Sequence, residues 1–237
     1  MNGLIDEMPI KHPNRSGLWI YKGKESFPIW WLNDQGYCEY KIYLQFEKGI
    51  KSEKTEQMIE GSKIHDQLYT DFKQASIPSS FKEIVELSKL EVQISREFKL
   101  RSLQYGMIGK ADEIWFYPDK LIVIDDKPGP KKYPVGKNIP WEGDVNQVYG
   151  CCLALKEKMI EEFQDTRPII AALRKRGTDD IYWNEIFDEN AENKIIGVIN
   201  HIHRLISLEE EYKSNDKPGK CRGCSLKMEC DKNISNI

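Results

Sequence analysis

Apolar residues along the chain recur with two different spacings, one typical of strands and one typical of helices. Leu121-Ile122-Val123-Ile124 is an unbroken apolar run, which is typical of a buried strand, and the segment 107–117 before it predicts another strand. Pro118-Asp119 between them predicts a tight turn. The two strands should therefore form a hairpin.

The same patterns predict the other elements. Helices are expected near 37–47, 55–73, 81–89, 142–160 and 190–212, and strands near 91–100, 105–117, 120–127, 167–174 and 180–187. This order of helix, three strands, helix and strand predicts an α/β fold with strand 120–127 in the middle of the sheet. With 237 residues, 40% hydrophobic content and no Ser/Gly-rich linker or repeat, one domain spanning 1–237 is expected.

The hairpin carries acidic residues on both strands. Asp125-Asp126-Lys127 ends the second strand, and alternation places Asp125 and Lys127 on one side and Asp126 on the other. Asp112, near the middle of the partner strand, can then meet Asp125. Two converging carboxylates favour a hard divalent cation between them, such as Mg²⁺ or Mn²⁺.

Lys127 would complete a hydrolytic site. An ammonium two residues beyond a metal-bound carboxylate can orient or help deprotonate an attacking water and offset charge on a phosphate. Together with the carboxylates it predicts metal-dependent hydrolysis of a phosphodiester bond. The alternative is a strand that simply ends in solvated charge, since short motifs match by chance.

Two flanking segments add polar candidates. Gly61-Ser62-Lys63-Ile64-His65 lies where apolar residues recur at helical spacing, and Asp144-Val145-Asn146-Gln147 opens another helical stretch. A neutral imidazole from His65 can ligate Mn²⁺, and the amide of Gln147 can hold a water or a phosphate oxygen. The alternative for His65 is a helix histidine that faces solvent or packs against the core.

Six cysteines suggest a second metal centre. No secretory signal or transmembrane run is visible, so a cytoplasmic, reducing compartment without disulfides is expected, and no membrane partner. Cys221-x2-Cys224 in a loop flanked by Pro, Gly and Lys predicts a metal knuckle, to which Cys230 adds a third thiolate. Cys38 is the best candidate for the fourth ligand.

The two remaining cysteines, Cys151 and Cys152, fall within an apolar helix and are expected to be buried small hydrophobes. Zinc and a [4Fe–4S] cluster both accept four thiolates. Spacing alone therefore leaves both open for the knuckle.

Net charge gives no general signal for nucleic-acid binding, because it is −3. A DNA-binding surface would have to be local. One candidate is the Pro/Gly loop from Lys127 to Lys137, which contains Lys131 and Lys132, and another is Arg174-Lys175-Arg176 at the end of a later strand. The alternative for both is a solvated turn.

Taken in order, these motifs resemble the RecB-type nucleases of the PD-(D/E)xK superfamily and, within it, the fourth CRISPR-associated (Cas) protein family. The shared features are Gly-x3-His, Gly-x2-Asp, hydrophobic-Asp-x-Lys, a helical Gln and one early with three late cysteines, which here correspond to Gly61, His65, Gly109, Asp112, Asp125, Lys127, Gln147, Cys38, Cys221, Cys224 and Cys230. The resemblance spans roughly Cys38 to Cys230.

The resemblance implies an α-β-β-β-α-β core, a divalent metal held by His65, Asp112 and Asp125, and a catalytic lysine at Lys127. It also implies a [4Fe–4S] cluster that joins the N-terminal region to segment 218–230 through the four cysteines Cys38, Cys221, Cys224 and Cys230. This family usually has a tyrosine four residues after the glutamine, where this chain has Cys151, with Tyr149 two residues earlier. The resemblance therefore leaves open which residue, if any, takes the role of that tyrosine in this chain.

The function implied by the resemblance is a metal-dependent exonuclease acting on single-stranded DNA ends. In the family this activity trims DNA fragments before a CRISPR integrase inserts them, so that integrase is a possible partner. A replication or repair nuclease with the same core, of viral or cellular origin, is the enzymatic alternative. A cluster-stabilised DNA-binding subunit without catalysis is the non-enzymatic one.

Overall fold

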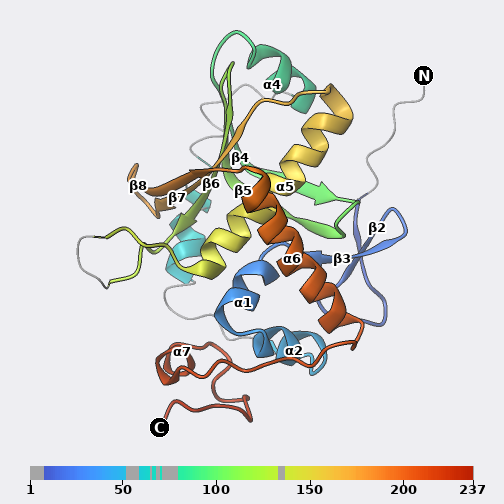
Figure 1. The fold of residues 1–237 in the computed structure, drawn as a ribbon, viewed down its shortest axis with the longest axis vertical. Helices are drawn as coiled ribbons and strands as arrows, with labels where there is room; N and C mark the ends of the chain where they lie inside the picture. The colour runs from blue at the N-terminus through green and yellow to red at the C-terminus, as the bar shows by residue number, and fades with distance from the viewer. Residues whose placement is uncertain are drawn as a thin grey trace.

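A central mixed β-sheet flanked by helices forms the fold in the computed structural model, which describes residues 8–51, 59–64, 66–67, 70, 80–132 and 137–236 (Figure 1). The strands run in the spatial order β1-β2-β3-β5-β6-β7-β8, and β4 pairs with β5. Their bounds are β1 Ile10–Lys11, β2 Trp19–Tyr21, β3 Lys24–Pro28, β4 Gln93–Ser102, β5 Met107–Phe116, β6 Leu121–Lys127, β7 Ile169–Lys175 and β8 Ile181–Ile186.

The hairpin predicted from the sequence is confirmed. β5 and β6 pair antiparallel, and the turn between them closes through the Tyr117 amide, which donates to the Lys120 carbonyl at 2.9 Å. β6 then pairs parallel with β7 along its whole length. The acidic strand therefore lies in the middle of the sheet, as expected.

One edge of β5 is shared by two strands. β3 pairs in parallel with Met107 and Ile108, whereas β6 pairs with the segment from Glu113 to Phe116. The stretch 109–112 of β5 lies between these two partners. Gly109 belongs to this stretch, and a Cβ at that position would lie 2.8 Å from the Ile29 Cβ. Glycine therefore lets the end of β3 approach β5 at this position.

The helices follow the amphipathic patterns of the sequence. Their bounds are α1 Trp31–Cys38, α2 Tyr40–Phe46, α4 Phe81–Leu87, α5 Glu142–Phe163, α6 Glu189–Ile206 and α7 Pro218–Arg222. α5 packs against β4 to β7, α1 and α6, and its first half is buried on all sides, including Val148, Cys152 and Leu155. This burial confirms that Cys152 serves as a small core hydrophobe, and Cys151 is buried as well.

α1 crosses the first turn of α5 at a very short distance. A Cβ added at Gly36 would lie 2.7 Å from the Gly143 Cα, and one added at Gly143 would lie 2.5 Å from the Asn33 carbonyl oxygen. Only glycine fits on both sides of such a crossing. The crossing places the N-terminal helix directly against the start of α5.

Several sequence-based boundaries were wrong. The predicted helix 37–47 is two helices, because α1 begins earlier at Trp31 and α2 follows it directly. The predicted helix 190–212 ends at Ile206, and Leu208 just beyond it has φ 61°, which is left-handed backbone. Of the predicted helix 55–73, residues 59–64, 66–67 and 70 are helical. The rest of it lies outside the described residues.

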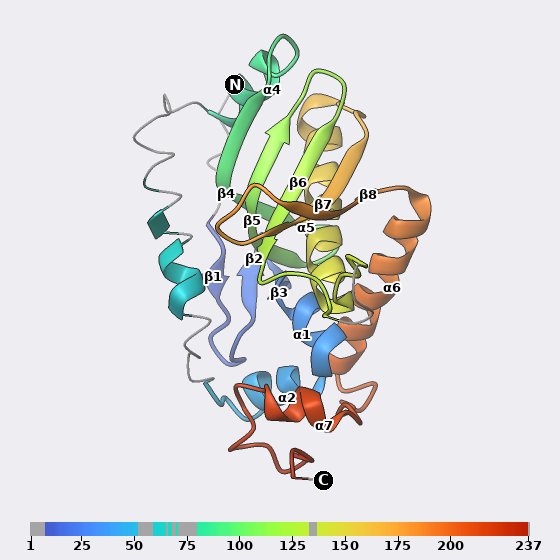
Figure 2. The ribbon, with the colours of Figure 1, turned by 90° about the vertical axis from the view of Figure 1, so that its left-hand side faces the viewer.

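The N-terminal helices meet the C-terminal segment. α2 and α7 lie next to each other in both ribbon views (Figures 1 and 2). The Lys220 ammonium donates to the carbonyls of Gly36 at 3.1 Å and Tyr37 at 2.7 Å, and the Tyr40 hydroxyl donates to Asp231 at 2.8 Å. The two ends of the chain are thus joined by direct hydrogen bonds.

In the part of the chain that the structure describes, none of the helices combines the length and apolar character needed to cross a bilayer.

Candidate active site

Asp112 and Asp125 converge where β5 and β6 separate. Asp125 is 4% exposed, and an Asp112 oxygen accepts the Asp126 backbone N–H at 2.7 Å. Burial and then repulsion from Asp125 raise the pKa of the Asp112 carboxyl well above its usual range. A cation between the two carboxylates would remove this repulsion. The predicted meeting of the two side chains is therefore observed.

Lys127 is held among acceptors on the same side of β6. Its ammonium lies 2.8 Å from Asp125 Oδ2, 2.9 Å from Gln147 Oε1 and 3.9 Å from Asp144 Oδ1. Burial by itself would lower the pKa of Lys127, but the charges of Asp125 and Asp144 outweigh it and raise the pKa. The side chain is therefore an ammonium, suited to orienting a water or balancing negative charge.

Gln147 links the helix to the strand. In addition to accepting from Lys127, its amide Nε2 lies 3.4 Å from Asp125 Oδ1. The helix α5 that carries it is fixed against α1, so the amide is positioned by the Gly36–Gly143 crossing. The structure thus brings together four of the residues that the sequence predicted for the site, Asp112, Asp125, Lys127 and Gln147.

Two residues near the site, Asp144 and Asn33, were not predicted from the sequence as site residues. Asp144 is 7% exposed and accepts from Asn33 Nδ2 at 2.7 Å, and burial raises the pKa of its carboxyl. Its position three residues before Gln147 on one helix face is a signal that the sequence contains. Asn33 comes from the distant N-terminal helix, and no local pattern marks it.

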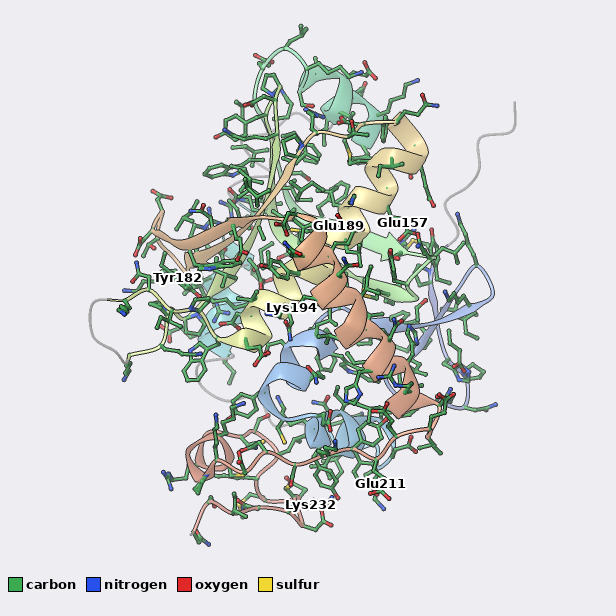
Figure 3. The ribbon with its side chains drawn as sticks, in the orientation of Figure 1. Glu157, Tyr182, Glu189, Lys194, Glu211 and Lys232 are labelled. Carbon is green, nitrogen blue, oxygen red and sulfur yellow. The ribbon has the colours of Figure 1, made fainter. Side chains whose placement is uncertain are left out.

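Tyr182 on β8 is a third addition (Figure 3). Its hydroxyl is buried and has no hydrogen-bond partner within the described residues. Burial, followed by the negative charges of Asp144 and Asp125, raises the pKa of Tyr182. An unpaired phenol close to the carboxylates is a candidate donor to a water or phosphate at this site.

A cysteine, Cys151, occupies the position four residues after Gln147. Cys151 is buried one helical turn beyond Gln147, and burial followed by the charge of Asp125 raises the pKa of its thiol well above the usual range. Tyr149 instead packs against Trp183 and Phe187, with ring centroids 6.1 and 5.5 Å apart. Tyr149 therefore belongs to the core between α5 and β8.

His65, the expected third metal ligand, lies outside the described residues. The helical residues before it pack against the end of β7. A Cβ added at Gly61 would lie 2.2 Å from Arg176 Nη1, and Ile64 approaches Gly177. The Arg176 guanidinium in turn donates to the Asp126 carbonyl at 3.3 Å.

The opposite side of β6 carries a buried ion-pair network. Arg174 Nε lies 2.7 Å from Asp126 Oδ1, and Arg174 Nη2 lies 3.0 Å from Glu113 Oε2, which also pairs with Arg96. The prediction of a DNA contact at Arg174 is therefore wrong, because the side chain is 5% exposed and fully paired inside the fold. Lys175 beside it is exposed.

Asp126→Ala is expected to affect stability more than chemistry. Removing one partner of a buried ion pair costs about 3–5 kcal/mol, and here Arg174 and Arg96 would be left to share Glu113, with one positive charge uncompensated. The Asp112 contact uses the Asp126 backbone N–H and should survive. Urea unfolding should show the loss, whereas the folded protein should retain metal-dependent cleavage within a few-fold at low temperature. A folded but inactive Asp126→Ala protein would contradict this division.

The four knuckle cysteines line one small cavity between α2 and the C-terminal segment, namely Cys38, Cys221, Cys224 and Cys230. Backbone amides point at the sulfurs, since Asn215 N–H donates to Cys38 Sγ and Leu226 N–H to Cys224 Sγ, both at 3.4 Å. Lys232, labelled in Figure 3, also lines this cavity, and its ammonium lies 4.3 Å from the centre of the Tyr40 ring. Four thiols around one cavity suit a thiolate-bound group.

The donor sets define what each site can hold. Across the described ranges, which exclude His65 but include the four knuckle cysteines, no three His, Cys, Asp or Glu side chains are placed close enough together to hold one metal ion. Asp112 and Asp125 supply two hard oxygen ligands for a divalent cation, whose further ligands would be water, a phosphate oxygen or a residue outside those ranges. The carboxylate oxygens of Asp112 and Asp125 are therefore the kind of ligand that Mg²⁺ or Mn²⁺ prefers.

The loop after β6 borders a groove of about 740 Å³. Lys131 lines it, with its ammonium 5.6 Å from the centre of the Trp141 ring, and Lys217 and Lys220 line it from the C-terminal side. Lys132 is exposed next to Lys131. Glu142 and Asp144 line the groove as well, so its positive charge is confined to the lysines. These lysines are compatible with contacts to DNA phosphates, which for Lys131 and Lys132 remain a prediction.

Comparisons with known proteins give structural similarities only. No family model and no curated protein matches the chain. The solved structure of the protein SSO0001 has a TM-score of 0.49 at 15% identity, covering 88% of this chain and 87% of that chain. A protein from Eubacterium rectale named "Putative exonuclease" has a TM-score of 0.43 at 15% identity, covering 90% and 88%. A function does not follow from fold similarity at this level.

Proposed function

We propose that this chain is a divalent-metal-dependent DNA nuclease that hydrolyses phosphodiester bonds. The observation that carries the proposal is the convergence of two carboxylates, the half-buried Asp112 and the buried Asp125, with an ammonium, Lys127, held 2.8 Å from Asp125. A structural ion pair needs one carboxylate, whereas a second one beside it repels the first until it takes up a proton or a cation binds between them. Such an arrangement is typical of a functional site.

The residues divide the chemistry between them. A divalent ion bound to Asp112 and Asp125 would activate a water and polarise the scissile phosphate. Lys127, kept protonated by its acidic neighbours, orients that water and balances the charge that develops on the phosphate oxygens. Gln147 keeps Lys127 in place and offers its amide to the water or to a phosphate oxygen.

The finer part of the proposal follows the motif resemblance. It is an exonuclease on single-stranded DNA ends that acts in CRISPR spacer acquisition, next to an integrase. A replication or repair nuclease with the same site would have the same chemistry. Genome neighbourhood separates the two contexts.

Metal removal tests the nuclease proposal. A 5′- or 3′-labelled single-stranded oligonucleotide should be degraded in Mn²⁺ or Mg²⁺, and chelation with EDTA should stop the reaction because no activated water is then available. Adding excess Mn²⁺ back should restore it. Retention of DNA binding without any cleavage in either metal would instead favour a DNA-binding subunit.

We also propose that Cys38, Cys221, Cys224 and Cys230 hold a [4Fe–4S] cluster. Support comes from the shared cavity and from the backbone amides directed at two of the sulfurs, which suit an electron-rich thiolate. Zinc is the competing occupant, because it also takes four thiolates. Either group would tie α1 to the C-terminal segment.

The absorption spectrum of protein purified without oxygen separates the two. We expect a brown protein with a broad visible band, and each of the four knuckle substitutions Cys38→Ala, Cys221→Ala, Cys224→Ala and Cys230→Ala should bleach it. The matched controls Cys151→Ala and Cys152→Ala remove buried thiols elsewhere and should keep the colour. A colourless protein with one zinc per chain would contradict the iron–sulfur assignment. Retained colour in Cys38→Ala would exclude Cys38 as a ligand.

A further inference from the structure

A pocket of about 470 Å³ opens directly beside the candidate active site. Gln147 lines it, and the same side chain contacts both Lys127 and Asp125. Gly109, from the stretch of β5 that lies between β3 and β6, forms part of the same wall. The pocket and the carboxylate pair are therefore neighbouring parts of one surface.

Trp30 gives this pocket an aromatic wall. It is 45% exposed, although the next residue, Trp31, is fully buried. The two rings meet edge to face, with centroids 6.1 Å apart and planes at 85°, so the Trp30 ring has a packed neighbour on one side. Trp19 of β2 and the apolar Ile29 and Ile108 line the pocket as well. An indole held in this way is a platform on which a flat ligand can stack.

Cations surround the apolar wall. The basic residues lining the pocket come from β4 and β5 and are Lys99, Arg101 and Lys110. Within the described lining, Glu97 is the one acidic residue, and it forms an ion pair with Lys110 at 2.8 Å. Among the described lining residues the positive charges outnumber the negative one, which complements a polyanion. Aromatic faces combined with cations are the means by which proteins hold single-stranded nucleic acid.

We propose that this pocket holds an unpaired nucleobase of the DNA strand, stacked on Trp30. The backbone phosphate of the same nucleotide then lies at Gln147 and Asp125. This inference rests on the proposed nuclease function and adds to it the residue that selects the substrate. A base inside a duplex is stacked on both faces and paired at its edge, so it does not reach Trp30 unless the strand is opened. Single-stranded ends are therefore preferred.

Binding measured without cleavage tests the pocket. Fluorescence anisotropy in EDTA is recorded for single-stranded oligonucleotides in which one abasic nucleotide is moved along each end. At one position, loss of the base should weaken wild-type binding roughly tenfold, the usual size of one base–aromatic stack. Trp30→Ala should weaken binding of the intact oligonucleotide by a similar factor and show no further loss at that position. Trp30→Phe, which keeps a ring, should retain most of the affinity.

Tyr117→Ala is the matched control, because Tyr117 is a half-buried aromatic residue at the turn after β5 and lines neither this pocket nor the groove after β6. In this control variant, removal of the base at that position should weaken DNA binding by the same factor as in the wild type. Independent, additive losses for Trp30→Ala and the abasic site would overturn the inference. So would a dimer, seen by sedimentation, that Trp30→Ala abolishes while DNA binding stays unchanged, because the pocket would then serve as an interface between copies.

The nucleobase pocket and the nuclease activity can be tested separately. If the protein cuts DNA but Trp30→Ala shows no coupling to any abasic position, the pocket assignment fails and the nuclease remains. If the coupling is present and no metal supports cleavage, the nuclease proposal fails and the assignment of a nucleobase pocket is retained. Circular dichroism of Trp30→Phe and Trp30→Ala verifies that both variants fold.

Discussion

Asp125→Asn is expected to lower Mn²⁺- or Mg²⁺-dependent cleavage by roughly a thousandfold or more, because a metal-bound water contributes several kcal/mol to catalysis. The substitution keeps the size of the side chain and removes a charged oxygen ligand. Lys127 retains Gln147 and Asp144 as partners, so the local fold should persist. Asp112→Asn should have a comparable effect. Initial rates at saturating metal measure both.

Asp165→Asn is the matched control for this series. Asp165 forms an ion pair with Arg167 at 2.6 Å at the far end of α5, and it has no contact with the candidate site. Its loss should leave the cleavage rate within a few-fold of the wild type. Equal activity of Asp125→Asn and Asp165→Asn would mean that the buried carboxylate pair is structural.

Lys127→Met is expected to leave DNA binding nearly unchanged while the single-turnover rate falls by roughly 10²–10³, the usual effect of losing one donor to a developing charge. The ammonium lies among Asp125, Gln147 and Asp144 rather than on the surface, so its contribution belongs to the transition state. Single-turnover rates at saturating enzyme and equilibrium binding across a salt series separate rate from affinity.

Lys131→Met provides the contrasting pattern. As a phosphate contact, its loss should weaken binding and reduce the salt slope by about one, while bound DNA is still cut at a near-normal rate. A Lys127→Met protein that follows this second pattern would place Lys127 among the phosphate contacts and exclude its catalytic role.

The centre of the fold follows from local patterns. The apolar run before Asp125 identifies a buried strand, and period-two alternation then assigns Asp125 and Lys127 to one side and Asp126 to the other, as the contacts with Gln147 and Arg174 confirm. The turn between β5 and β6 is likewise predicted by adjacent residues, Pro118 and Asp119. The spacing of the motif therefore predicts which side chains meet.

Other features depend on contacts between distant segments. Arg174 belongs to a basic cluster in the sequence, and only the parallel pairing of β6 with β7 places it next to Asp126. β1, β2 and β3 are two to five residues long, too short for a periodic signal, so the Trp30 pocket at their junction with α1 was not expected. Asn33 reaches Asp144 through a helix crossing that glycines permit.

Titration of Mn²⁺ into the protein without DNA shows whether Asp112 and Asp125 bind a divalent metal, and contaminating nucleases do not affect it. Calorimetry or electron paramagnetic resonance should show saturable binding to the wild type and to Asp165→Asn. Asp112→Asn and Asp125→Asn should each lose at least about tenfold in affinity, since each removes a charged oxygen ligand. The same Mn²⁺ affinity in all four proteins would contradict the assignment of Asp112 and Asp125 as the metal site.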